Sequence, residues 1–66
     1  MENCIRTLRE ERSWTQGQLG SQVGVTRQTI LFIEKGKYVP SLPLALKLSK
    51  VFNRTVNELF WLDTTD

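Results

Sequence analysis

The stretch from residue 15 to residue 36 limits the fold of this chain more than any other, because it is typical of two short helices joined by a tight turn. Thr15 and Gln18 are spaced as a capping box, in which the two side chains satisfy free amide groups in the first turn of a helix. Gly24 ends this helix, since glycine easily adopts the left-handed conformation found at helix ends. Thr26 then caps a second helix. We therefore expect a helix, a turn and a helix here.

Three more helices are expected outside this stretch, which gives an all-α fold of five short helices. One covers residues 1–11, with Asn3 as its N-cap. Another is capped by Ser41, and the last is capped by Thr55 and begins with a second capping box.

The helix that follows Ser41 is expected to be the central element of the core, because its apolar residues fall on two faces. The first face holds Leu42, Ala45, Leu46 and Phe52, and the second holds Leu44, Leu48 and Val51.

The two ends of the chain allow two interpretations. In the first, the terminal helices extend to the ends and only residues 63–66 fray. In the second, residues 1–4 and 60–62 pair as short strands.

Two glycines, Gly17 and Gly20, lie inside the first helix of the central stretch, and each costs about 1 kcal/mol relative to alanine. Gly20 lies on the same face as Leu19 and Val23, so we expect another backbone to approach it closely. No such approach is expected at Gly17.

Length and composition set further limits. A chain of 66 residues corresponds to one domain, expected at residues 4–62 with the helix-turn-helix motif at about 15–35. The net charge of +2 permits nucleic-acid binding without proving it. A single cysteine excludes an intrachain disulfide, which fits the cytoplasm. No apolar run approaches the roughly 18 residues of a membrane span.

The composition also argues against an enzyme. The chain has no histidine, which is the commonest general base and the commonest metal ligand. It has no paired carboxylates and no cluster of metal-ligating residues. We therefore expect no catalytic residue, metal, cofactor or small-molecule ligand.

The chain resembles the Cro/CI-type helix-turn-helix (XRE) family, whose members are the lambda-repressor-like DNA-binding domains. The matching segments are Thr15–Gln16, Leu19, Gly24–Ile30, Ile33–Glu34, Gly36–Lys37, Pro40–Leu42, Ala45–Leu46 and Asn57–Phe60. The resemblance spans about residues 4–61 and is closest to small stand-alone dimeric repressors. It implies a transcription regulator that binds double-stranded DNA as a homodimer, most simply a repressor on a palindromic operator. Such a regulator would be associated with the nucleoid.

The resemblance also assigns roles to residues. In this family, side chains at the start of the second motif helix contact base edges in the major groove. Carried over, the base-contacting residues are Arg27, Gln28, Thr29 and Phe32, and the phosphate-contacting residues are Gln16, Thr26, Lys35, Lys37 and Tyr38. The chemistry agrees, because arginine pairs with guanine and glutamine pairs with adenine. Arg9 and Glu34 match a family pair that forms an internal salt bridge.

Some residues have two open interpretations. The family usually has polar residues at the positions of Leu31 and Phe32, and four apolar residues in a row cannot all face one core. Phe32 is expected either to contact thymine methyl groups or to pack against a neighbour, and packing is favoured for Leu31. Arg6 and Arg12 of the first helix are interpreted as solvated charges rather than phosphate contacts.

A dimer needs apolar residues outside the motif. The candidates are Val39, Pro40, Leu59, Phe60, Trp61 and Leu62. Trp61 has the alternative of covering the core of its own chain. A different class of function also stays open: a protein-interaction module, resembling an antitoxin or an anti-repressor, that uses the same fold to bind another protein.

Overall fold

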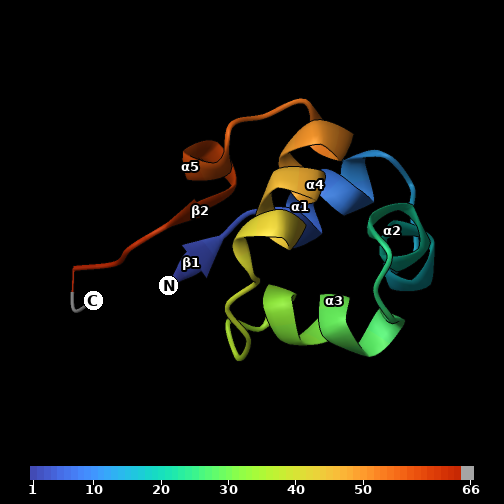
Figure 1. The fold of residues 1–66 in the computed structure, drawn as a ribbon, viewed down its shortest axis with the longest axis horizontal. Coiled ribbons are helices and arrows are strands. Elements are labelled where there is room, and N and C mark those ends of the chain that lie inside the picture. Colours follow the sequence, from blue (N-terminus) through green and yellow to red (C-terminus); the bar gives the residue numbers. More distant parts are fainter. Residues whose placement is uncertain (65–66) are drawn as a thin grey trace.

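A computed structural model describes residues 1–64 of the chain. Five helices and a two-stranded sheet make up this part (Figure 1). The helices are α1 (Ile5–Glu11), α2 (Gln16–Val23), α3 (Arg27–Glu34), α4 (Leu42–Phe52) and α5 (Val56–Leu59), and the strands are β1 (Glu2–Asn3) and β2 (Phe60–Trp61). The expected all-α fold of five helices is confirmed, and of the two interpretations of the chain ends, the one with short paired strands is confirmed.

The two ends of the chain pair with each other. β1 runs antiparallel to β2, with Glu2 opposite Trp61 and Asn3 opposite Phe60. Extension of the first and last helices to the ends is therefore wrong, because backbone hydrogen bonds between strands replace helical ones. Of the tail expected to fray, residues 63–66, the first two are exposed and belong to neither a helix nor a strand. The last two lie outside the described residues.

Asn3 ties the first strand to the helices. Its Oδ1 accepts a hydrogen bond from the Ile5 amide at 3.1 Å, and its Nδ2 donates to the Ile33 carbonyl at 2.9 Å. The N-cap position of α1 belongs to Cys4, not to Asn3 as expected. The Asn3 side chain thus joins the start of α1 to the end of α3.

Local caps fix where the other helices begin. The side chains of Thr15, Thr26 and Ser41 each accept a hydrogen bond from an amide in the first turn of the following helix, as expected. At α5, Glu58 Oε1 accepts hydrogen bonds from the Thr55 amide at 2.8 Å and from the Thr55 hydroxyl at 3.0 Å. These bonds, with the amide as the larger cause, lower the pKa of Glu58.

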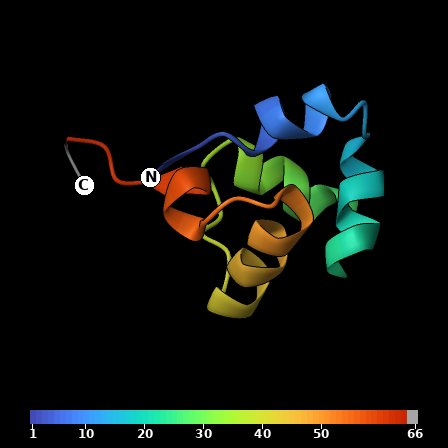
Figure 2. The same cartoon turned by 90° about the horizontal axis from the view of Figure 1, so that it is seen from above.

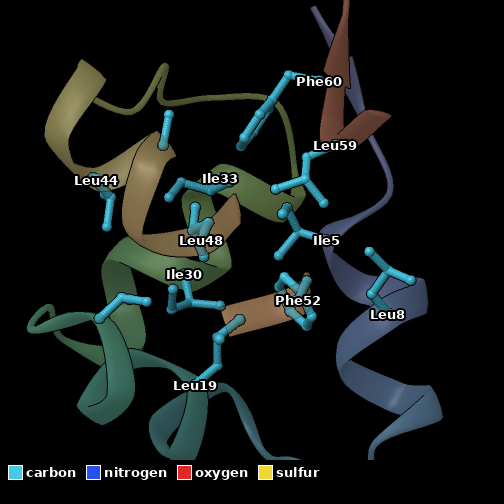
Figure 3. Close-up of a cluster of buried hydrophobic side chains, with 12 residues drawn as sticks. Ile5, Leu8, Leu19, Ile30, Ile33, Leu44, Leu48, Phe52, Leu59 and Phe60 are labelled. Carbon is cyan, nitrogen blue, oxygen red and sulfur yellow. The ribbon is translucent and has the colours of Figure 1, made fainter. Parts of the chain in front are cut away.

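One hydrophobic core holds the elements together, and its side chains point toward one another (Figure 3). Its buried members are Ile5, Leu8, Leu19, Val23, Ile30, Ile33, Leu44, Ala45, Leu48, Phe52, Leu59 and Phe60. Burial of α4 on its second face is confirmed, and on its first face Phe52 is buried. The expectation is wrong for Leu42 and Leu46 of the first face, which are 67% and 53% exposed. Helical spacing turns these two leucines away from the buried stripe of α4.

Arg12 does not lie in solvent as its charge suggested. Its Nη2 donates to the Phe52 carbonyl at 3.1 Å, and its guanidinium lies 5.0 Å from the centre of the Phe52 ring. The Trp14 ring packs beside Phe52 at a centroid distance of 5.9 Å. Arg12 therefore covers the core at the end of α1, as cations often do over aromatic rings.

The close approach expected at Gly20 is confirmed. A Cβ atom built there would lie 2.6 Å from the Val25 carbonyl oxygen, a distance that real Cβ atoms do not show. The approaching backbone belongs to the turn between α2 and α3, not to a separate helix. At Gly17, the nearest atom to such a Cβ is the Thr15 hydroxyl oxygen at 3.9 Å, an ordinary van der Waals distance, so a methyl group fits without a clash.

Alanine substitution at these two glycines should therefore change the stability of the fold in opposite directions. Gly20→Ala should destabilise the fold by about 1–3 kcal/mol, because the turn backbone must shift to admit the methyl group. Gly17→Ala should stabilise it by up to about 1 kcal/mol through helix propensity. Urea denaturation of the two variants beside the wild type measures both effects. A Gly20→Ala variant as stable as Gly17→Ala would contradict the close approach.

Candidate nucleic-acid interface

The amino end of α3 is an exposed helical tip. Thr26 is its N-cap, and its Oγ1 accepts a hydrogen bond from the Thr29 amide at 3.3 Å. The hydroxyl groups of the two threonines are 3.2 Å apart and also hydrogen-bonded. Arg27 and Gln28 are exposed, and Thr29 is half-buried. Three of the residues that the sequence predicted to contact bases, Arg27, Gln28 and Thr29, thus lie together in the first turn of α3.

The apolar run in α3 divides as helix geometry requires. Ile30 and Ile33 are buried in the core, whereas Leu31 is half-buried and Phe32 is 39% exposed. Phe32 comes four residues after Gln28, so the two side chains share a face of α3. The structure therefore groups Phe32 with the exposed tip and gives it no burial in the core.

The carboxyl end of α3 is held by the predicted ion pair, which is confirmed. Arg9 Nε lies 2.6 Å from Glu34 Oε2, and a second hydrogen bond of 3.2 Å joins Arg9 Nη2 to Glu34 Oε1. Arg9 Nη1 also donates to the Trp14 carbonyl at 2.8 Å. The side chains are only 12% and 4% exposed, and the hydrogen bond with Glu34 raises the pKa of Arg9. This pair therefore fixes α3 against α1.

Gln16 belongs to the same network. Its Nε2 donates to Glu34 Oε1 at 3.1 Å, and its side chain is half-buried at the start of α2. An amide nitrogen carries two hydrogens, and this bond uses one of them. Gln16 therefore has a structural role through its hydrogen bond to Glu34, which the sequence interpretation missed.

The other predicted phosphate contacts follow α3. Lys35 is the C-cap of α3, and Gly36 adopts a positive φ of 72° immediately after it. Lys37 and Tyr38 are exposed in the connection that leads to α4. The structure thus distributes the predicted contacts over the beginning of α2 and both ends of α3.

The residues proposed for a dimer divide into two groups. Leu59 and Phe60 are buried in the core of their own chain, so they are not available as a free surface. Side chains alternate along a strand, which turns Phe60 inward and Trp61 outward, and Trp61 is 45% exposed. In the described part of the chain, the exposed large apolar residues outside α3 are Tyr38, Val39, Leu42, Leu46, Trp61 and Leu62, while Pro40 is half-buried.

These elements define a helix-turn-helix protein, with α2 at the end of the molecule opposite the strands (Figures 1 and 2). The carboxyl end of α3 lies beside β1, where Asn3 donates to the Ile33 carbonyl. Comparison with known sequences agrees. Residues 5–59 match the family model described as helix-turn-helix, and the chain belongs to this family as an XRE-type regulator. None of the helices in the described part is both long and apolar enough to span a membrane.

Relatives of similar length occur in bacteria and archaea. The chain is 51% identical over 63 residues to the uncharacterized HTH-type transcriptional regulator YgzD of Bacillus subtilis, covering 96% of both chains. It is 49% identical over 63 residues to an uncharacterized HTH-type transcriptional regulator of Archaeoglobus fulgidus, covering 96% of this chain and 90% of the other. A relative of the same description in Methanocaldococcus jannaschii is 45% identical over 60 residues, with 91% of each chain covered.

The buried pair of Arg9 and Glu34 should contribute strongly to the stability of the fold. Glu34→Ala should destabilise the fold by about 3–5 kcal/mol, because it leaves the Arg9 guanidinium without its partner. Glu10→Ala is a matched control, since Glu10 pairs with Arg6 at 3.3 Å on the surface, where the side chains are 55% and 71% exposed. This control should change stability by no more than about 0.5 kcal/mol. Thermal unfolding of both variants measures the difference, and equal melting temperatures would contradict the assignment.

Proposed function

We propose that this DNA-binding transcription regulator is a homodimeric repressor that recognises a palindromic operator through the major groove. The observation that carries the proposal is the exposed first turn of α3, where Arg27 and Gln28 extend from a tip capped by Thr26. Occupation of the operator would then exclude RNA polymerase from the same DNA.

Base recognition follows from the chemistry of this tip. The Arg27 guanidinium can donate two hydrogen bonds to guanine O6 and N7, and the Gln28 amide can pair with adenine N6 and N7. Each such contact contributes about 1–3 kcal/mol of discrimination. Thr29 offers a methyl group and Phe32 an exposed ring to thymine methyl groups on the same face of α3.

Contacts to the DNA backbone would hold the tip in register. The proposed residues are Gln16, Thr26, Lys35, Lys37 and Tyr38, and all but the half-buried Gln16 are exposed. Such contacts position a protein on DNA and carry no sequence information of their own.

Two copies would occupy the two half-sites. The recognition helices of the two copies would then lie roughly 34 Å apart, the distance between half-sites one helical turn apart. Two copies joined at the strand end, through Val39, Pro40, Trp61 and Leu62, would place both recognition helices on one side of the DNA. Leu42 and Leu46 are two further exposed apolar residues, both on α4.

The dimer is tested by sedimentation equilibrium at tens of micromolar protein. The wild type should sediment as a dimer, and Leu62→Glu should dissociate it, because a charge would enter the apolar surface. Thr7→Glu is the matched control, since Thr7 is exposed on α1 and the added charge is the same. A wild type that remains monomeric at this concentration would contradict the dimer.

Recognition is tested on DNA selected from a random pool. Arg27→Ala should relax the preference at one base pair of each half-site, whereas Lys37→Ala should weaken all sequences alike and reduce the dependence of affinity on salt. Gel-shift titrations at several salt concentrations measure both effects. Absence of DNA binding at every salt concentration would contradict the proposal and favour the protein-interaction module instead.

A further inference from the structure

A hollow with a volume of about 300 Å³ lies between α1, the start of α2 and the end of α3. Its lining residues are Arg6, Arg9, Gln16, Leu31, Glu34 and Lys35. Three of these side chains are cationic and one is anionic, so the lining carries a net positive charge. The hollow therefore favours an anion.

The single carboxylate in the hollow does not repel an anion strongly. The Glu34 side chain is only 4% exposed, it accepts two hydrogen bonds from Arg9, and it accepts a third from Gln16. The negative charge of Glu34 is thus balanced by the positive charge of Arg9, which also lines the hollow. The cations that face solvent are Arg6 from α1 and Lys35 from the end of α3.

Arg6 is available for a new partner. Its Nε lies 3.3 Å from Glu10 Oε2, one helical turn along α1, and its side chain is 71% exposed. Exposed pairs of this kind are weak and exchange readily with other partners. A guanidinium forms stronger, bidentate hydrogen bonds with a phosphate group, whose geometry matches its planar fork.

We propose that Arg6 contacts the DNA backbone and, together with Lys35 and Gln16, holds one phosphate in this hollow. The inference rests on the proposed DNA-binding function and extends the interface from the helix-turn-helix motif to α1. Gln16 and Lys35 link the hollow to the proposed backbone contacts, and Leu31 provides an apolar wall from α3. Because the contact is to phosphate, Arg6 positions the domain on DNA and does not select bases.

The test compares the salt dependence of DNA binding for Arg6→Ala, Arg6→Lys and the wild type. Arg6→Ala should weaken binding to all sequences alike and reduce the slope of log affinity against log salt by about 0.9 for each half-site. Arg6→Lys should retain most of the slope, because the cation remains. Thermal unfolding of each variant establishes that the fold is intact.

Two control variants distinguish a phosphate contact by Arg6 from a general effect of net charge or of helix stability. Arg54→Ala removes the same charge from the link between α4 and α5, which lies on the side of α4 away from α3 (Figure 1), and should leave the slope near the wild-type value. Glu10→Ala removes the ion pair of Arg6 but keeps the cation, so it should also preserve the slope.

The inference is overturned if Arg6→Ala retains the wild-type slope while Lys37→Ala reduces it, and in that case the proposed function stands. It is also overturned if Arg54→Ala or Glu10→Ala has the same effect as Arg6→Ala, which would indicate net charge or helix stability as the cause. A wild type that binds no DNA contradicts the proposed function itself, and this inference with it.

Discussion

The bidentate pair between Arg9 and Glu34 is the interaction on which the rest of this structure depends. It joins α1 to the end of α3, and the same guanidinium and carboxylate also bind the Trp14 carbonyl and the Gln16 amide. One small network of hydrogen bonds thus connects α1, α2, α3 and the link between α1 and α2. The Arg9 and Glu34 side chains are only 12% and 4% exposed. Loss of either partner would therefore leave the other charge buried and unpaired, which destabilises a fold strongly.

The other end of α3 is fixed by steric contact and not by charge. Gly20 lets the turn backbone at Val25 approach α2, and the Val25 amide donates to the Gly20 carbonyl at 2.9 Å. Thr26 then starts α3 immediately after this turn. Because α3 is anchored at both ends and buried along the stripe of Ile30 and Ile33, its exposed first turn has a defined position relative to the whole domain.

Features set by local chemistry could be predicted from the sequence, and features set by distant contacts could not. The bounds of α2 and α3 followed from their caps and glycines. The pairing of β1 with β2 joins the two ends of the chain, so no local pattern distinguishes it from a longer terminal helix. Helical period identified two apolar stripes on α4, but only packing decided that Leu42 and Leu46 face outward.

The same limit applies to the site. Arg27 and Gln28 could be proposed as base contacts because their motif is continuous in sequence, whereas the hollow at Arg6 exists only after α1, α2 and α3 come together. The bond from Gln16 to Glu34 was missed for the same reason. Leu59 and Phe60 were assigned to a dimer surface because apolar character near a chain end does not distinguish a core residue from an exposed one.

We propose that the face formed by the start of α2 and by α3 binds DNA. The most direct test is to titrate isotope-labelled protein with its selected DNA and to follow backbone amide chemical shifts by NMR. We predict the largest changes at residues 15–17 and 26–32, with little change in the link between α4 and α5. Changes concentrated in that link, with residues 26–32 unaffected, would contradict the account.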